Sequence, residues 1–224
     1  MATTHPTSPK ATGRTLPRPV SDGPANETGR DRILRVAAEL FLTGGYAETS
    51  IRIIADAVDM RPASIYHHFA SKDALLAEIL DIGMNAVTEA FETASNETAN
   101  AQRTGHQLLE AHVAAHLRAL FAHHAFTAAH VTVFPFVPAS VRSAAVPQRD
   151  AYEAKWTALL KSVAPTATPE TLRLTRLALF GAMNSAVQWF DSSESSADEL
   201  ATALVATLWN GLGTLAEPSS GEAR

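Results

Sequence analysis

The stretch from residue 50 to residue 72, SIRIIADAVDMRPASIYHHFASK, constrains the fold of this chain more than any other. Apolar residues recur at helical spacing over 51–58, which predicts a short helix with one apolar face. Asp59 can then take the positive φ that a tight turn between helices requires. Pro62 restarts the chain at a first helical position, where its missing N–H costs nothing. A second short helix over 62–67 completes the pattern of a helix-turn-helix.

The residues on either side of this stretch make the prediction more specific. A helix predicted over 30–43 ends in Gly44-Gly45-Tyr46, and the downstream residues are Ile65-Tyr66-His67-His68-Phe69 followed by Ser71-Lys72-Asp73. Over about residues 28–87 this compound pattern resembles the TetR family of bacterial transcriptional regulators. The resemblance implies an all-α fold with an N-terminal three-helix DNA-binding domain and a C-terminal helical ligand-binding and dimerisation domain.

Three positions depart from the pattern of that family. Arg61 stands where a capping Ser or Thr is usual, Asp59 where Gly is usual, and Ile53 where an acidic residue is usual. These departures leave the predicted fold unchanged, and they leave the identity of the base contacts open.

Composition limits the other possibilities. The chain has 224 residues, of which 46% are apolar, enough for a sizeable core in one or two domains. It has no cysteine, which excludes disulfides and thiolate metal sites. No apolar run reaches the roughly 18 residues of a membrane span, and residues 1–29 lack the apolar middle of a signal peptide. We therefore expect a cytoplasmic protein with no membrane partner.

The charge is unevenly divided along the chain. The net charge is −5, but residues 1–75 carry nine Lys and Arg against eight Asp and Glu. The acidity therefore belongs to the C-terminal part. A nearly neutral N-terminal part can bind DNA if its cations face one side, and a dimer doubles the contacts.

The predicted organisation has four parts. Residues 1–27 are rich in Pro, Ser and Thr and predict a disordered arm, whose Lys10, Arg14 and Arg18 either reach a minor groove or are simply solvated. The remaining parts are a DNA-binding domain at 28–88, a ligand-binding and dimerisation domain at 89–216, and a disordered tail at 217–224. Periodicity and breaks predict helices over 71–94, 105–122, 126–134, 147–163, 169–190 and 197–214, with a polar break at 95–104.

The candidate DNA-binding residues follow from how a recognition helix enters a major groove. Its first residues lie nearest the base edges, where Arg can bond guanine and apolar groups can meet a thymine methyl. The family resemblance adds phosphate contacts from Tyr66 and His67, and Lys72 begins the next helix as a cation at an anion-binding N-terminus. The full set is Thr49, Ser50, Arg52, Arg61, Pro62, Ala63, Ser64, Tyr66, His67 and Lys72.

The candidate effector site lies in the second half of the chain. Its predicted lining is His112, His116, Phe134, Phe136, Tyr152, Trp156, Asn184 and Trp189. Apolar walls with a few polar groups are typical of a small-molecule site, and equally of an aromatic core. Residues 181–212 resemble family members that respond to acyl-coenzyme A thioesters, so the expected effector is acyl-CoA-like or hydrophobic. Arg142 and Arg149 are the cations that would meet such an anion.

The last two predicted helices are candidates for a homodimer interface. Gly181, Ala182, Ser185 and Ala186 form a ridge of small residues, and the last helix carries Leu200, Leu204, Leu208, Trp209 and Leu212. Pairing with symmetry mates would give a four-helix interface. The alternative is that both helices close the core of one monomer.

Two other classes of function compete with DNA binding. His112 and His116, at i and i+4, could share a metal, but a third ligand is needed, and core or surface histidines are the preferred interpretation. None of the H-E-x-x-H, G-x-S-x-G, P-loop and G-x-G-x-x-G motifs is present, so we expect no enzyme, no metal and no cofactor. The sequence therefore predicts a ligand-responsive regulator, a repressor released from a pseudo-palindromic operator. The alternatives are a His-ligated metal sensor, an enzyme or a helical adaptor, all without DNA affinity.

Overall fold

The computed structural model describes residues 27–99 and 103–216, and within them all regular structure is helical, which confirms the all-α fold. The predicted arm and tail lie, apart from Glu27, outside the described residues. No helix of the described part combines the length and apolarity needed to cross a bilayer. The helices are α1 Gly29–Gly44, α2 Ile51–Ala57, α3 Pro62–His68, α4 Lys72–Ala99, α5 Gly105–Ala122, α6 His124–Thr132, a 3-10 turn η1 Phe134–Phe136, α7 Ala139–Val163, α8 Pro169–Trp189 and α9 Ala197–Ala216.

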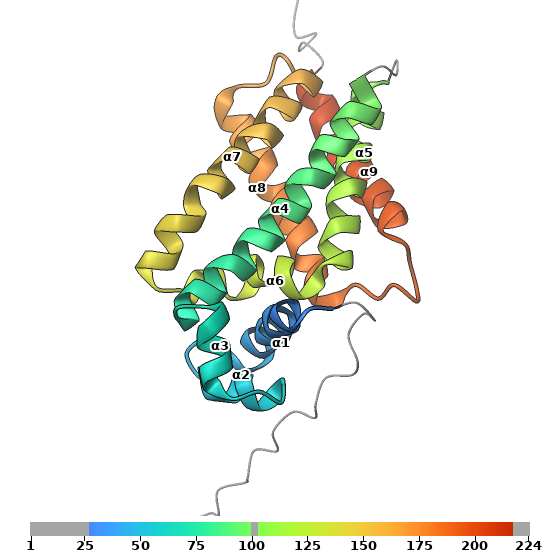
Figure 1. The fold of residues 1–224 in the computed structure, drawn as a ribbon. Helices are drawn as coiled ribbons and strands as arrows, with labels where there is room; N and C mark the ends of the chain where they lie inside the picture. The colour runs from blue at the N-terminus through green and yellow to red at the C-terminus, as the bar shows by residue number, and fades with distance from the viewer. Residues whose placement is uncertain (1–26, 100–102, 217–224) are drawn as a thin grey trace, which may run out of the picture.

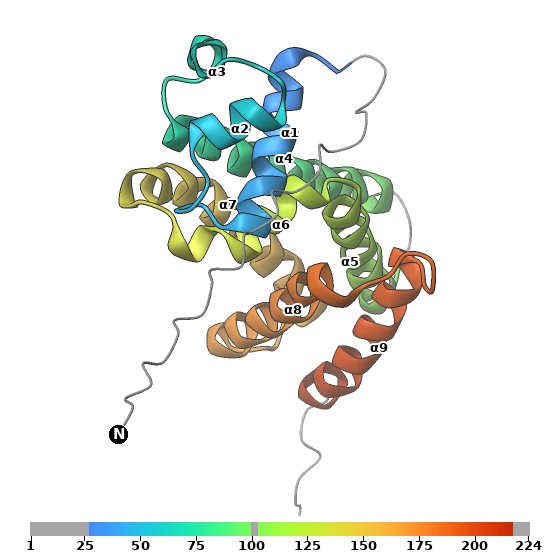
Figure 2. The same ribbon diagram turned by 90° about the horizontal axis from the view of Figure 1, so that it is seen from below.

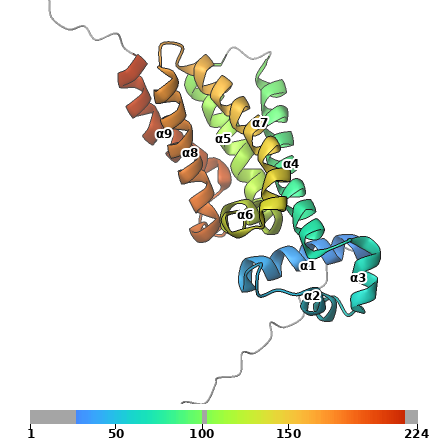
Figure 3. The same cartoon turned by 90° about the vertical axis from the view of Figure 1, so that its left-hand side faces the viewer.

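The molecule has a small head and a longer body. Figure 1 shows α1, α2 and α3 at one end, and α4 running from them into a bundle with α5, α7, α8 and α9. Short α6 lies where the head meets the body, packed against both α1 and α4 (Figures 1 and 2). In Figure 3, α2 and α3 lie at the end of the molecule remote from α9.

Caps and a tight turn fix the helices of the head, and the roles of Gly45 and Asp59 are those that the sequence predicts. Gly45 ends α1 with a φ of 82°, and its N–H donates to the carbonyl of Phe41. The Ser50 hydroxyl caps α2 by accepting from the amide of Ile53 at 3.2 Å. Asp59 takes the left-handed turn with a φ of 56°. These devices set the angle between α2 and α3.

The starts of α8 and α9 were also predicted by their caps. The Thr168 hydroxyl accepts from the amide of Thr171 at 3.1 Å, with Pro169 in the first helical position. Ser196 and Glu199 form the predicted capping box, in which each side chain accepts from the backbone N–H of the other.

Two predicted helix boundaries are wrong. The polar break expected at 95–104 is helical up to Ala99, and within it the hydroxyls of Ser95 and Thr98 donate to carbonyls one turn earlier, at 2.9 and 2.7 Å. Helix α7 begins at Ala139 and passes through Pro147. An internal proline costs a backbone hydrogen bond, which burial of Val141 near the start of α7 helps to offset.

Side-chain packing divides the structure into two cores. The first, here called the junction core, joins α1–α3 and the first turns of α4 to Ala129, Val133, Phe134, Val137 and Val141. The second, the body core, begins on α4 at Met84 and continues through α5, α7, α8 and α9. Along α4, the side chains therefore pass from the junction core to the body core between Leu80 and Met84, earlier than the domain boundary predicted after residue 88. Helix α6 lies between the two cores and contacts both.

Candidate functional site

The first turn of α3 is presented to solvent at the end of the head. Arg61, Pro62 and Ala63 are exposed, and Ser64 is half-buried. Ile65 behind them is fully buried in the junction core. Tyr66 follows with 55% of its surface exposed, and His67 is exposed beside it. The helix therefore holds a polar tip outward on an apolar anchor, as the helix-turn-helix prediction requires.

The start of α2 exposes only some of the residues predicted to contact phosphate. Ser50 and Arg52 are exposed there. The side chain of Thr49 is only 3% exposed, and its hydroxyl lies 2.8 Å from the carbonyl of Gly45, to which it donates. The prediction that this side chain faces phosphate is wrong, since the hydroxyl is used to close the connection between α1 and α2.

Lys72 is engaged within the head. Its Nζ donates to the carbonyls of Tyr46 at 2.8 Å and Thr49 at 3.0 Å, and it lies 4.1 Å from the centroid of the Tyr46 ring. The Tyr46 hydroxyl in turn donates to the carboxylate of Asp73. Burial, with that carboxylate second, raises the pKa of Tyr46. Lys72, predicted as a cation at an anion-binding helix N-terminus, is bonded to the α1–α2 connection in this structure, and its contact with phosphate stays a prediction.

Two arginines of α1 are paired with carboxylates. Arg30 donates to Glu78, and Arg35 donates to Glu27 at 2.8 Å. The hydrogen bond from Arg35 lowers the pKa of Glu27. At the end of α3, His68 is exposed, whereas Phe69 is buried.

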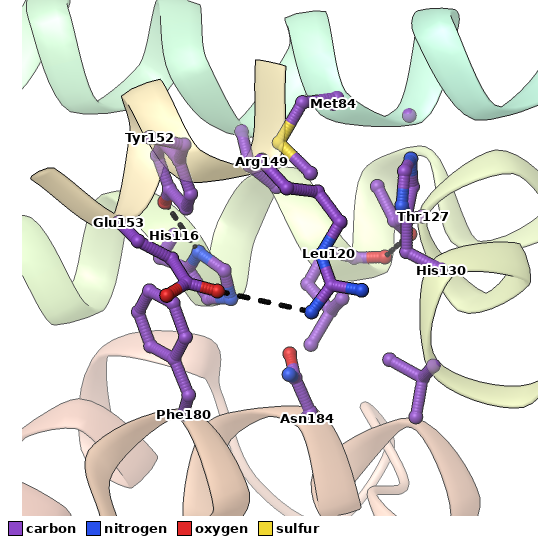
Figure 4. Close-up of a pocket in the computed structure, with 13 residues that line it drawn as sticks. Met84, His116, Leu120, Thr127, His130, Arg149, Tyr152, Glu153, Phe180 and Asn184 are labelled. Atoms are coloured by element: carbon purple, nitrogen blue, oxygen red, sulfur yellow. Dashed lines mark hydrogen bonds and ion pairs between the residues drawn. The ribbon is translucent and has the colours of Figure 1, made fainter. Parts of the chain in front are cut away.

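A cavity of about 60 Å³ lies within the body beside α6. Figure 4 shows its polar side chains converging from α5, α6, α7 and α8. This volume is well below the roughly 300–1,000 Å³ of pockets that hold drug-sized compounds. The lining residues are Gly83, Met84, Val87, His116, Leu120, Thr127, His130, Val131, Arg149, Tyr152, Glu153, Phe180 and Asn184.

Three of the eight predicted effector residues line this cavity, namely His116, Tyr152 and Asn184. Trp156 and His112 are buried in the body core but do not line it. The Trp156 ring lies 6.4 Å from that of Tyr152, and His112 is held by Leu108 and Ser95. The prediction is wrong for these two as direct contacts, because their side chains are used to pack the core.

The remaining three predicted residues lie elsewhere. Phe134 belongs to the junction core, and Phe136 is 81% exposed at the turn before α7. Trp189 is 58% exposed on the outside of α8. It stands five residues beyond Asn184, a rotation of about 140° around the helix, which turns it away from the cavity.

Two buried histidines in the cavity wall have unsatisfied nitrogens. The Nδ1 atom of His116 lies 2.7 Å from the hydroxyl of Tyr152, and the Nε2 atom of His130 donates to the carbonyl of Leu80 at 2.6 Å. Within the described residues, Nε2 of His116 and Nδ1 of His130 have no hydrogen-bond partner. Burial lowers the pKa of each histidine to about 4. Both side chains are therefore neutral at neutral pH.

At one side of the cavity the carboxylate of Glu153 lies close to one arginine and farther from another. Oε2 of Glu153 lies 2.8 Å from Nη2 of Arg176, whereas its Oε1 lies 3.8 Å from Nη2 of Arg149. Arg142, the other cation considered, instead donates to the carbonyl of Pro135 at 2.9 Å, away from the cavity.

The sequence analysis did not predict that α6 lines the cavity. The spacing of Thr127, His130 and Val131 at i, i+3 and i+4 was the available signal.

The paired histidines of α5 do not act together. His112 donates to the carbonyl of Leu108 at 2.8 Å, whereas His116 bonds Tyr152. Within residues 27–99 and 103–216 no group of three or more His, Asp or Glu side chains is placed to hold a metal ion.

The outer face of α8 carries an exposed apolar stripe. Leu174 and Leu177 are about half exposed, and Trp189 continues the stripe beyond Gly181, whose face is open. The leucines of α9 lie differently from the prediction. Leu200, Leu204 and Leu208 pack against the body core, because α9 lies on α5. The side chain of Leu212 is outside the described part of the chain.

Two family models match most of the chain. Residues 33–79 match the model described as "Bacterial regulatory proteins, tetR family", and residues 102–212 match "Tetracyclin repressor-like, C-terminal domain". The first match covers the helix-turn-helix, and the second covers α5 through most of α9.

Individual proteins are similar mainly in the head. The chain is 42% identical over 62 residues to the HTH-type transcriptional regulator TcmR of Streptomyces glaucescens, covering 28% of this chain and 26% of TcmR. It is 41% identical over 64 residues to the HTH-type transcriptional repressor KstR2 of Rhodococcus jostii, covering 29% and 31%. The matches thus span less than a third of these relatives. The crystal structure of PfmR, a TetR family transcriptional regulator from Thermus thermophilus, superposes with a TM-score of 0.69 at 27% identity, covering 81% of this chain and 96% of that chain.

Proposed function

The chain belongs to the TetR family of bacterial transcriptional regulators, and from this premise we propose that it is a repressor released from DNA by a small effector. A homodimer inserts its two α3 helices into successive major grooves of a pseudo-palindromic double-stranded operator and blocks transcription. The effector binds in the body cavity and favours a dimer whose head spacing no longer matches the operator. Such a regulator acts on DNA in the cytoplasm, and its family comprises regulators, not enzymes.

The observation that carries the proposal is the exposed tip of α3 on its buried anchor, Ile65. In the proposed complex Arg61 bonds guanine, and Pro62, Ala63 and Ser64 meet neighbouring base edges. Tyr66 and His67, with Ser50 and Arg52 across the groove, bond phosphate oxygens. Lys72 contributes by holding the α1–α2 connection in place.

The exposed stripe of α8 supports dimerisation through this helix. Leu174, Leu177 and Trp189 together present an exposed apolar face, which an isologous interface would cover. Exposed Ala203 and Ala206 of α9 are small enough to let a partner helix approach. In this proposed interface α9 contributes less surface than the sequence analysis predicted from its leucines.

The route from cavity to head runs through α6. Thr127 and His130 line the cavity from one side of α6, and Ala129 and Val133 pack into the junction core from the other. Helices α4 and α6 touch closely, since a Cβ at Gly83 would lie 2.5 Å from the carbonyl oxygen of Phe126. The cavity must widen to take an effector. We propose that widening displaces α6 and with it α1 and the head.

We propose repression of transcription, not activation, because the relative KstR2 is a repressor. The apolar side chains of Met84, Val87, Leu120 and Phe180 suit an effector with an apolar part. An acyl-CoA-like compound and a smaller hydrophobic compound both meet that requirement.

The test is selection of duplexes from a random pool by the purified full-length chain, followed by fluorescence anisotropy on the enriched site. We expect inverted half-sites, two protomers per site by light scattering, and loss of affinity in Tyr66→Ala. The neighbouring reading frames then supply natural operator candidates. A chain that enriches no duplex, or that remains monomeric on DNA, contradicts the proposal.

A further inference from the structure

We infer that the compound bound in the body is a small carboxylate with an apolar body, whose anionic group binds between Arg149 of α7 and His116 of α5. Calling this compound an effector rests on the proposed function, but its binding does not. Figure 4 shows both side chains and Asn184 of α8 converging on one part of the cavity.

The first observation is an excess of positive charge at the cavity. Arg176 takes most of the Glu153 charge, since its Nη2 lies 2.8 Å from Oε2 and its Nη1 donates to the Glu153 carbonyl and the Thr157 hydroxyl, each at 3.2 Å. Arg149 is 3.8 Å from the same carboxylate, beyond hydrogen-bond distance. Its guanidinium also lies 4.5 Å from the centroid of the Phe134 ring. One carboxylate thus serves two guanidinium groups, and Arg149 can accept another anion.

The second observation is a buried donor with no partner. The Tyr152 hydroxyl lies 2.7 Å from Nδ1 of His116, and within the described residues no other acceptor takes its hydrogen. The hydroxyl therefore donates to Nδ1, which places the proton of the neutral imidazole on Nε2. Nε2 is buried and, among the described residues, makes no hydrogen bond of acceptable geometry, and the side-chain amide of Asn184 is its nearest polar neighbour. A buried N–H without an acceptor is destabilising, and an anionic oxygen that accepts from it would remove that cost.

The third observation separates a carboxylate from other ligands. A cationic ligand would be repelled by Arg149. The carboxylate of Glu153 could offset little of that repulsion, because it is already paired with Arg176. A neutral amide would satisfy His116 but leave the charge of Arg149 without a new partner. The cavity of about 60 Å³ must widen for any of these ligands, and a small carboxylate requires far less widening than a coenzyme A head group. Opposite the polar groups, Met84, Leu120 and Phe180 offer apolar contact for a short chain or ring.

The experiment is isothermal titration of the full-length dimer with hexanoate and benzoate, each beside its neutral amide, and with hexanoyl-coenzyme A. Wild type should bind at least one carboxylate at least about tenfold more tightly than its amide. Arg149→Gln should lose that preference. Arg149→Lys, which keeps the charge without the fork, should retain part of it. Arg142→Gln is the matched control, because Arg142 also lies over Phe134, at 5.7 Å, but outside the cavity.

Several outcomes overturn the inference. It fails if neither carboxylate binds up to about 10 mM, if amide and carboxylate bind equally, or if only hexanoyl-coenzyme A binds. It also fails if Arg142→Gln loses as much affinity as Arg149→Gln, with both variants folded by circular dichroism. Operator binding, measured separately by anisotropy, distinguishes the two proposals. If the protein binds operator but prefers the amide, the proposed function stands and this inference is wrong. If it prefers the carboxylate but binds no DNA, this inference stands and the proposed function is wrong.

Discussion

The tip of α3 and the body cavity place their polar side chains in opposite ways. At the tip, Arg61, Tyr66 and His67 lie in water, and the junction core beneath them is dominated by aliphatic side chains. In the body, His116 and His130 lie inside the protein among aromatic rings, each with one unsatisfied nitrogen. The tip stands outside a completed core, whereas the cavity results from a core left incomplete.

The difference has an energetic consequence. Polar groups on the surface cost little stability because water solvates them in the absence of DNA. Buried polar groups without partners cost about 1–3 kcal/mol each until a ligand or water satisfies them. The head can therefore be altered for binding without altering stability, whereas in the body the two properties are coupled. The following predictions test that division.

The largest expected effect separates two neighbours on α3. Ile65→Ala removes a fully buried anchor and should lower the free energy of unfolding by about 2–5 kcal/mol. Tyr66→Ala changes an exposed side chain and should alter it by less than about 0.5 kcal/mol while weakening binding to all duplexes. Urea denaturation and duplex anisotropy measure the two quantities. Equal losses of stability would show that the tip belongs to the core after all.

Acid should act on the body. Burial holds the pKa of His116 and His130 near 4, below the ordinary value of 6.5, so the unfolded chain takes up protons first as pH falls. Stability is therefore fully present above about pH 6.5 and is lost down to about pH 4. Between about pH 7 and about pH 5 each histidine should account for about 2 kcal/mol.

Denaturation at several pH values checks this expectation. The double variant His116→Gln, His130→Gln should flatten the dependence on pH. The variant His67→Gln, His68→Gln, which alters exposed histidines of the head, should leave it as in the wild type. An unchanged slope in the first variant would place the acid sensitivity elsewhere.

The same division explains what sequence reasoning could and could not find. The head is built from local devices within a few residues of one another, and two of them, Gly45 at the end of α1 and the turn at Asp59, were predicted, whereas the Ser50 cap was not. The cavity needs residues from five helices, and its membership depends on helix rotation and tertiary packing. His116 and Asn184 were found from chemistry, while Trp189 failed by rotation alone. The role of Lys72 was missed because its carbonyl partners lie more than 20 residues away in sequence. Thr49 was missed although its partner, the carbonyl of Gly45, is local.

A smaller effect is expected at the contact that joins head and body. In Gly83→Ala the new Cβ meets the Phe126 backbone carbonyl, which cannot move as a side chain can. Stability should fall by about 1–3 kcal/mol, and operator affinity should fall with it as α6 is displaced. Gly29→Ala is the control, because its Cβ meets only the flexible end of Met60, at 3.3 Å. Thermal unfolding and anisotropy of both variants test this, and equal behaviour would mean that the α4–α6 contact carries no coupling.

The smallest effect concerns two cations of the head, and salt dependence can distinguish them. Arg52 is exposed at the start of α2, whereas the Lys72 ammonium is already bonded to two carbonyls. Each phosphate contact contributes about 0.9 to the slope of log affinity against log salt. Arg52→Gln should therefore flatten the slope by about one contact per protomer. Lys72→Gln should weaken binding at every salt concentration by loosening the α1–α2 connection, while its slope stays that of the wild type. If Lys72→Gln instead flattens the slope as much as Arg52→Gln, the ammonium leaves its carbonyls for phosphate when DNA is bound, and the head would then be rearranged by binding just as the body is.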